Sequence, residues 1–531
     1  EEALRYKEQG YDAFKFRCGT DWQGAGMTFA NYIPILQRLR QAVGADFRLV
    51  HEAVGTLDGT LESIITDFAP VLEELGFYWF EEAFGGTDPE HIDLFLQLKE
   101  QYCGHFLTKK CRLLTLVSSI AKPKKPTHEA NGTMDLAEKI LNELAITKPQ
   151  RKFLLNLFTT ILALRGKVNF RNLSRYSEVS ARTYARQFDQ PFDFIGLNRA
   201  LIDQVLLPHR PRLVVFDPCF IPKAGRHTPE LAYFWHGCHG RAEKGLEVSA
   251  FSLVDLEHHT GYALSVQQTP APGRADDETM IDSYLDHLHT VVPYLHPDET
   301  HLAVDGQFAK KKWLDGVEAV GLHTIGKLRC DAHMRFLYTG PPRAHGSGRQ
   351  KTYDGKVDWQ DLSRFEYITE QDGLELYTQV LNHVSLKRTL RVVVVLDRRD
   401  PKKPRYALLF STEVDLDAVT IFYLYKARFQ IEFIFRDAKQ FTGLSDAQTR
   451  DAQRLHFHFN AALTILNIAK IERRKAQPDD QPMAYSIASV KACYFNELFL
   501  QRFFSTFGWD GSWLKKSPLY PSLREFGRIA A

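Results

Sequence analysis

The sequence has little of what would place the protein in a membrane or outside the cell. Its 531 residues include seven cysteines, an odd number scattered along the chain, which argues against a disulfide framework and for a reducing compartment. No apolar run approaches the ~20 residues of a membrane span, and no signal peptide opens the chain. We therefore expect a cytoplasmic protein without a membrane partner. The first residue is Glu1 and not Met, which predicts that the sequence begins inside a longer reading frame.

Two further absences concern chemistry. The sequence offers no convincing nucleophilic triad, so covalent catalysis through serine or cysteine is not predicted. The group His236, Cys238 and His239, with Cys219 and His227 upstream, matches no zinc-binding spacing, and a structural metal is not expected there. Carboxylates and basic residues remain as the candidates for function.

Charge is distributed unevenly along the chain. The net charge is +2 overall, but residues 1–98 carry a net charge of −10 and residues 99–531 one of +12. An acidic piece joined to a basic piece indicates two units of different origin, and the basic unit suits a polyanionic partner. The length allows about three or four domains.

Residues 1–98 alternate helical and strand patterns, which predicts a parallel α/β sheet. The segments AFKFR, GADFRLVHEA and WFEEAF resemble the enolase superfamily of mandelate racemase-like enzymes, which implies a fragment of a (β/α) barrel. The family's Lys-x-Lys is here Lys15-Phe16-Arg17, and its proline after the paired acids is Ala83. Glu52 and Glu81 stand where two metal ligands would be, but the remaining barrel strands are missing. We expect no activity from this fragment, and a racemase or lyase is the weakest alternative for the protein.

The rest of the chain divides by pattern. We predict a basic linker at 99–133, a helical DNA-binding region at 134–205, a first core segment at 206–335, a β-rich insertion at 336–416, a second core segment at 417–475 and a helical C-terminal region at 476–531. Met134 opens the helical region as a native start would, which suggests that a mobile element is fused to the barrel gene. Within it, two short helices predict a helix-turn-helix with Arg182 and Arg186 on its second helix. A helical bundle with a solvated basic face is an equal alternative.

Two aspartates follow apolar strand patterns. PRLVVFDPCF predicts a strand ending at Asp217, and HLAVDGQFA predicts one ending at Asp305. Ligands gather at the carboxyl ends of strands in α/β sheets. The elements between and after them (a hairpin, a helix, and then a helix and a strand) follow the order of an RNase H-like core, whose third acid lies on a later helix. Asp397 ends another apolar strand, but the turn residues after it favour a structural role.

Residues 419–441 predict an apolar helix that carries a polar stripe. At 3.6 residues per turn, Tyr425, Arg428, Glu432 and Lys439 fall within an arc of roughly 60°. Charges on a buried helix are costly unless they are paired or face a functional cavity. One interpretation is a structural Arg428–Glu432 pair; the other is a catalytic carboxylate beside phosphate-binding cations. Three carboxylates, Asp217, Asp305 and Glu432, suit a pair of Mg²⁺ ions.

The spacing Tyr425-x2-Arg428-x3-Glu432-x6-Lys439 is similar to the YREK signature of the DDE transposases of bacterial insertion elements (insertion sequence four and its relatives). FDPCFIPKAGRHT and VDGQFA resemble the two aspartate motifs of that family, with Pro218 as a departure, and the resemblance spans about residues 134–475. It implies that Asp217, Asp305 and Glu432 hold two Mg²⁺ or Mn²⁺ ions. Tyr425, Arg428, Lys439 and Lys223 would then bind phosphates.

The resemblance also implies a reaction and its partners. The expected activity is hydrolysis at the ends of the element, followed by attack of the released 3′-OH on target DNA. The expected partner is double-stranded DNA, bound by a homodimer in the synaptic complex at the bacterial nucleoid. Trp359, in the insertion, has a ring that could stack on an unpaired base or simply anchor its loop. A DNA-binding protein that has lost catalysis is the principal alternative.

Overall fold

The computed structural model divides the chain into two compact units, Glu1–His128 with Ala530–Ala531, and Glu129–Ile529. The structure describes residues 2–11, 13–17, 29–52, 69–75, 77, 79–81, 134–208, 210–237, 239–273, 279–342, 349–371, 373–399, 405–478, 485–506 and 519–529. The predicted linker at 99–133 and Ala83 therefore lie outside the described residues.

The first unit contains a three-stranded parallel sheet, as the alternating pattern predicts. Its strands are β1 (Ala13–Arg17), β2 (Arg48–Glu52) and β3 (Trp79–Glu81), in that order, and its described helices are α1 (Glu2–Glu8), α2 (Phe29–Val43) and α4 (Ala69–Glu74). Glu52 and Glu81 are register partners in β2 and β3, but their side chains lie outside the description. Leu36 of α2, Leu49 of β2 and Leu72 of α4 are fully buried.

The second unit begins with the helices expected for residues 134–205. They are α7 (Asp135–Glu143), α8 (Lys148–Ala163), α9 (Phe170–Tyr176), α10 (Ala181–Gln187) and α11 (Phe194–Ile202). The pair α9 and α10 matches the predicted two short helices. Each begins with a capping side chain: Asn169 accepts from the backbone N–H of Asn172 in α9, and Ser180 accepts from that of Thr183 in α10. The buried hydroxyl of Tyr184 in α10 lies 2.8 Å from Ser177 Oγ at the end of α9 and donates to Asn156 Oδ1 of α8 at 2.9 Å, which holds the pair together and against α8.

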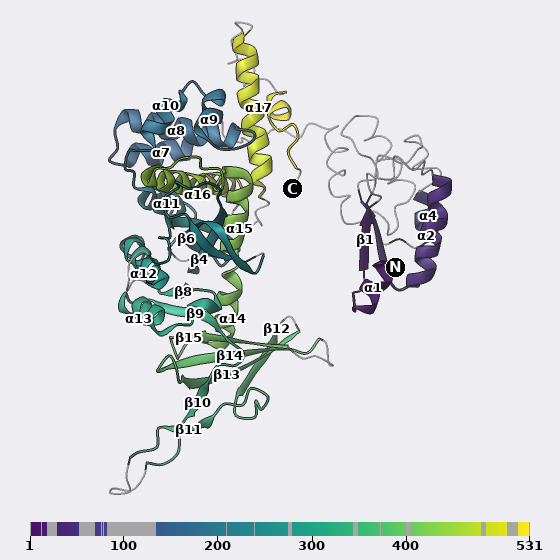
Figure 1. Cartoon of the computed structure of the whole chain (residues 1–531), viewed down its shortest axis with the longest axis vertical. Coiled ribbons are helices and arrows are strands. Elements are labelled where there is room, and N and C mark those ends of the chain that lie inside the picture. The colour runs from purple at the N-terminus through teal and green to yellow at the C-terminus, as the bar shows by residue number, and fades with distance from the viewer. Residues whose placement is uncertain are drawn as a thin grey trace. The chain divides into compact units, whose positions relative to one another are not determined.

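A large mixed sheet follows (Figure 1). Five of its strands lie in the order β7-β6-β4-β8-β9, and β4, β8 and β9 are parallel while β6 is antiparallel to both β4 and β7. These strands are β4 (Arg212–Pro222), β6 (Arg241–Asp255), β7 (Thr260–Gln268), β8 (His301–Ala303) and β9 (His323–Leu328). The short strand β5 (Ala232–His236) forms a hairpin with β6.

The two faces of this sheet carry different side chains. Phe216 of β4 contacts Trp313 of α13 (Lys311–Ala319) and Tyr284 of α12 (Met280–Val291), with ring centroids 5.0 and 5.3 Å away. Because side chains alternate along a strand, the next residue, Asp217, faces the opposite side. That side is covered by α15 (Gln430–Asp437), which packs on β4 and β7.

Residues 336–416, the predicted insertion, are rich in strands, and these strands extend the same sheet. Its strands are β10 (Met334–Leu337), β11 (Tyr353–Lys356), β12 (Glu366–Gln371), β13 (Leu374–His383), β14 (Arg388–Asp397) and β15 (Arg405–Ser411). Strand β15 pairs antiparallel with β9, so the ladder of hydrogen bonds passes from the core into the insertion without a break. Asp397, at the end of β14, pairs with Arg399 in the adjoining turn at 2.6 Å.

Helix α16 (Ala452–Lys475) closes the exposed edge of β7. Asn467 accepts from the backbone N–H of Ala263 at 2.9 Å and donates to its carbonyl at 2.6 Å, while Asn460 donates to the carbonyl of Val266 at 2.9 Å. These amides bond to backbone groups of β7 that would otherwise be free to pair with another strand. The chain continues in α17 (Ile487–Thr506) and α19 (Tyr520–Arg524). In the part of the chain that the structure describes, no helix has the length and apolar character to cross a membrane.

Candidate active site

The segment 419–441 is not the single helix that its sequence predicts. It forms α14 (Ala418–Ala427), α15 and a π-helical turn (Ala438–Thr442), with Arg428 and Phe429 at the first break. The break has a packing cause, because α14 lies on β9, β13, β14 and β15 whereas α15 lies on β4 and β7. One straight helix would not cover both parts of a twisted sheet. The break places Arg428 between the two helices.

Strand β4 does not end at Asp217 as predicted. It continues to Pro222 because β6 is long enough to pair with it as far as Gly245. Asp217 is therefore an interior residue of the strand that points toward α15. Asp305 does follow its strand, two residues after β8, where the N–H of Val304 still donates to the carbonyl of Ile325. The topology thus brings both aspartates to the centre of the sheet.

The two aspartates and Glu432 converge on the guanidinium group of Arg428. Its Nη1 lies 3.6 Å from Asp217 Oδ2, and its Nη2 donates to Glu432 Oε1 at 3.0 Å. The charge of Asp305 also acts on Arg428 and on Asp217. Only 12% of the Arg428 side chain and 17% of the Asp217 side chain are exposed, against 41% for Glu432. The predicted Arg428–Glu432 pair is therefore part of a larger acidic cluster.

The cluster holds more negative charge than Arg428 balances. Burial raises the pKa of Asp217 to about 7; Arg428 opposes the rise, and the neighbouring charges of Asp305 and Glu432 add to it. Burial alone would lower the pKa of Arg428, but the surrounding charges of Asp217, Tyr425 and Asp305 raise it instead. Arg428 is thus a permanent cation in a cluster where one carboxyl group is close to holding a proton.

The donor set fits a magnesium ion. Mg²⁺ prefers hard oxygen ligands and commonly binds through carboxylates. A divalent cation would also relieve the repulsion that raises the pKa of Asp217, which Arg428 relieves only in part. The residues that would hold the metal are Asp217, Asp305 and Glu432.

Two other residues of the polar stripe lie beside this cluster. The guanidinium carbon of Arg428 is 5.8 Å from the centroid of the half-buried Tyr425 ring. Lys439 is exposed on the π-helical turn, and its ammonium opposes the burial that raises the pKa of the Cys219 thiol to about 11. The sequence pattern associates Cys219 only with the histidine group, although its position two residues after Asp217 already puts it on the same face of β4. Backbone geometry fixes the end of the turn: Gly443 has a φ of 83°, and a Cβ there would lie 2.4 Å from Val168 Cβ.

The remaining predicted residues lie outside the carboxylate cluster. Lys223 is half-buried and donates to the backbone carbonyl of Ala447. Arg182 and Arg186 are exposed on α10. Trp359 is half-buried, its Nε1 donates to the carbonyl of Ala332 at 3.1 Å, and its ring lies 6.1 Å from that of Phe365. These contacts favour the anchoring interpretation of Trp359.

A cluster of acids on a mixed α/β sheet is the kind of site found in domains that act on phosphodiester bonds with metal ions. The family comparison agrees: residues 208–468 match the model of the transposase DDE domain. The match includes Asp217, Asp305 and Glu432, and it supports a transposase. A search of curated proteins finds no match.

The raised pKa of Asp217 predicts a stability that depends on pH. Between its ordinary value of 3.8 and about 7, the folded protein binds a proton that the unfolded chain releases. In buffer that contains a chelator, the unfolding temperature should therefore fall as the pH rises from about 4 to about 7. Asp217→Asn should flatten part of this slope in thermal melts; the rest belongs to groups such as Glu472, whose pKa burial raises to about 7. An unchanged slope in the variant would contradict the assignment.

Proposed function

We propose that this protein is a DNA transposase of a bacterial insertion element, with an RNase H-like catalytic core formed by β7-β6-β4-β8-β9. The observation that carries the proposal is the convergence of Asp217, Asp305 and Glu432 on Arg428. The strand order, with one antiparallel hairpin on β4 and parallel neighbours β8 and β9 on its other side, supports the core assignment.

The proposed reaction has two steps that use the same site. Water first hydrolyses a phosphodiester bond at the end of the element, so that one strand ends in a 3′-OH. This 3′-OH then attacks a phosphodiester bond of the target DNA, which forms the new bond and releases the target's own 3′-oxygen. Two Mg²⁺ or Mn²⁺ ions, held by Asp217, Asp305 and Glu432, would stabilise the attacking and leaving oxygens.

The cations of the stripe would hold the DNA ends. The planar fork of Arg428 can bind a phosphate through two N–H groups. In the structure, this fork contacts Asp217 and Glu432. We infer that these contacts are its resting state, and that metal binding by the carboxylates frees Arg428 for the DNA. Lys439 and the Tyr425 hydroxyl would contact neighbouring phosphates, and Lys223 is a weaker candidate because it already donates to Ala447.

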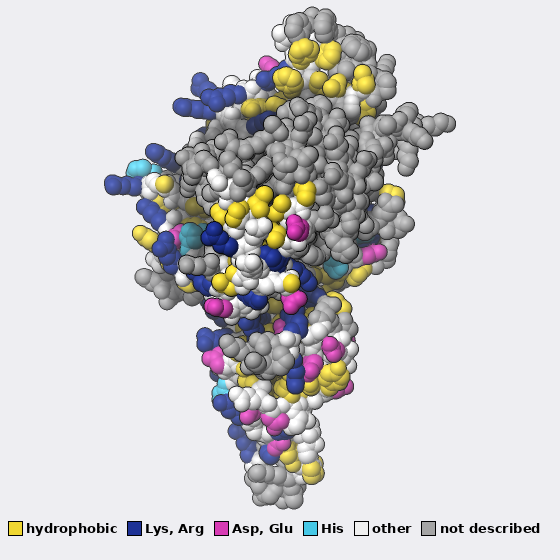
Figure 2. Space-filling model, turned by 90° about the vertical axis from the view of Figure 1, so that its right-hand side faces the viewer, with side chains coloured by type: hydrophobic (Ala, Val, Ile, Leu, Met, Phe, Trp, Pro, Cys, Tyr) yellow, Lys and Arg dark blue, Asp and Glu magenta, His cyan; other side chains and the backbone are white. Residues whose placement is uncertain are grey.

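Other parts of the second unit would position the duplex. Arg182 and Arg186 on α10 would contact the major groove, in the manner of a helix-turn-helix. Figure 2 shows Lys and Arg side chains along one margin of the visible face, beside the strands of the insertion, where they can follow a phosphate backbone. We propose a homodimer in the synaptic complex. We assign no activity to the first unit, which we interpret as a barrel fragment fused to the transposase.

Removal of metal should abolish the proposed activity. The full chain is incubated with end-labelled DNA that flanks its coding region, with Mg²⁺ or with a chelator. When Mg²⁺ is present, we expect cleavage that exposes 3′-OH ends at inverted repeats. When Mg²⁺ is chelated, the amount of cleaved DNA should fall to the background level. DNA binding without cleavage would favour a binding protein that has lost catalysis. If the protein neither binds nor cleaves this DNA, the proposed function is wrong.

A further inference from the structure

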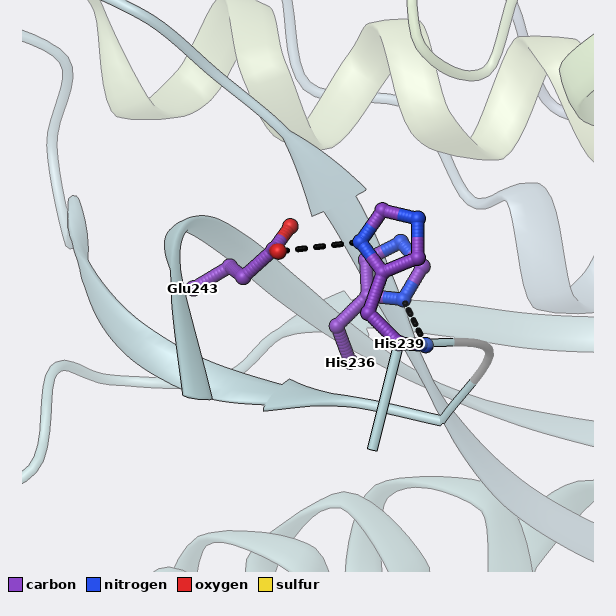
Figure 3. Close-up of side chains that lie close together, drawn as sticks. All are labelled: His236, His239 and Glu243. Atoms are coloured by element: carbon purple, nitrogen blue, oxygen red, sulfur yellow. Dashed lines mark hydrogen bonds and ion pairs between the residues drawn. The ribbon is translucent and has the colours of Figure 1, made fainter. Parts of the chain in front are cut away.

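The hairpin of β5 and β6 carries a second group of side chains that can bind a metal (Figure 3). His236 is the last residue of β5, His239 lies in the turn, and Glu243 lies in β6. His236 is the register partner of Arg241, two residues before Glu243. Side chains of paired residues, and of residues two apart on one strand, share a face of the sheet. The fold therefore places His236 and Glu243 together and closes His239 over them.

The three side chains are already close to one another. Each offers one ligand atom, and these atoms all lie within 4.8 Å of one another. The Nδ1 of His239 lies 2.9 Å from Glu243 Oε1. The two imidazole rings are stacked, with centroids 4.0 Å apart and planes inclined by 12°. A metal binds an imidazole through one ring nitrogen, and each of these two rings offers one such atom.

One histidine of this site is packed against the sheet, and the other is open to solvent. The ring of His236 packs against Phe220 of β4, with centroids 4.7 Å apart, which holds it against the sheet. The His239 side chain is 55% exposed, so an ion from solvent can reach it. Glu243 accepts from Arg241 Nε at 2.7 Å, and its contacts with His239 and Arg241 hold its pKa below the usual range. A carboxylate that is ionised and oriented in this way is ready to bind a cation.

We propose that His236, His239 and Glu243 bind a divalent transition-metal ion of the Zn²⁺ type, at a site separate from the carboxylate cluster. Two imidazoles and one carboxylate are a common zinc ligand set, with a fourth position left for water. Ligand atoms on a tetrahedral zinc ion lie about 3.3 Å apart. The His239–Glu243 distance is already shorter than this, and rotation of the exposed His239 side chain brings the set together. The ion would take the place of the present contact between His239 Nδ1 and Glu243 Oε1.

The chemistry of the two sites separates their metals. Imidazole ligands favour Zn²⁺ and its neighbours, whereas the all-carboxylate cluster favours Mg²⁺. A metal bound across the hairpin would tie its turn to both strands. Strand β5 would then present Tyr233 and Trp235, which are 68% and 63% exposed, from a fixed backbone. The inference does not depend on catalysis by Asp217, Asp305 and Glu432.

The test measures metal bound to the full, tag-free chain. After equilibrium dialysis against Zn²⁺ in excess Mg²⁺, we expect one tightly held zinc ion per chain, and visible absorption of tetrahedral Co²⁺ when Co²⁺ replaces it. His236→Asn and His239→Asn should each weaken binding by more than about a hundredfold, since loss of a residue that only orients a ligand already costs about 10–100-fold. The metal should also raise the unfolding temperature of the unmodified chain and not that of the variants.

Two controls keep the outcome specific. His227→Asn removes an exposed histidine elsewhere and should bind zinc normally. Glu432→Gln alters the carboxylate cluster and should also leave the zinc content at one. Circular dichroism of each metal-free variant should match that of the unmodified protein. The proposal is overturned by the absence of tight zinc, by normal binding in both histidine variants, or by a thiolate charge-transfer band with Co²⁺, which would place the ion on cysteine.

Discussion

Glu432→Gln should reduce Mg²⁺-dependent DNA cleavage by at least about a thousandfold, because metal stabilisation of the transition state is worth several kcal/mol and each 1.36 kcal/mol is a factor of ten. Glutamine keeps the size of the side chain and an acceptor oxygen, but it lacks the negative charge that would hold the metal. It also replaces the charged partner of Arg428 Nη2, now 3.0 Å away, with a neutral acceptor. The measurement is the single-turnover rate on labelled element-end DNA.

A matched substitution separates this effect from a general loss of charge. Glu318 is an exposed glutamate on α13 that pairs with Arg388, and Glu318→Gln should cleave at the normal rate. Glu432→Gln should still bind DNA, because Arg428 and Lys439 remain. A Glu432→Gln protein that cleaves as fast as the unmodified chain would remove Glu432 from the catalytic site.

Asn467→Leu should lower the free energy of unfolding of the second unit by about 3 kcal/mol, since each buried polar group left without a partner costs about 1–3 kcal/mol. Asn467 is 1% exposed and bonds to both backbone groups of Ala263 and to Asn198 Oδ1. Leucine fills a similar volume and replaces none of these bonds. The measurements are urea unfolding and hydrogen exchange at Ala263, whose amide should lose protection.

Thr464→Val is the matched control for this change. Thr464 is fully buried on the same helix, and its hydroxyl has no hydrogen-bond partner among the described residues. Its replacement by the isosteric valine should leave stability unchanged or slightly raised. If Asn467→Leu unfolds at the same urea concentration as Thr464→Val, the amide bonds to β7 do not hold the edge of the sheet.

The order of elements in the second unit is predictable because each element has a local signal. Period-two alternation around His258–Gly261 predicts the hairpin of β6 and β7, and 3.6-residue periodicity predicts α12. Asp217, Asp305 and Glu432 could be grouped because each occurs in a recognisable motif. The structure brings these three into one cluster with Arg428, and their role in catalysis stays a prediction.

The differences all depend on contacts between distant segments. The break at Arg428 reflects the two parts of the sheet that α14 and α15 cover, and the extension of β4 beyond Asp217 reflects the length of β6. Neither has a local signal, because residues 419–441 keep a mainly apolar, helix-like pattern across the break. The histidine pair was visible in the sequence, but its partner Glu243 is found only through strand pairing.

The continuous ladder from β9 into the insertion has a mechanical consequence. Domain movements usually turn about loop residues or the ends of elements, which absorb the change in backbone angles. Strand β15 is hydrogen-bonded to β9 on one side and to β14 on the other, so the insertion has no such pivot at its root. Its outer strands are therefore expected to move with β9 as one sheet, and if DNA binds along them as we propose, the sheet fixes the distance between that DNA and the carboxylates.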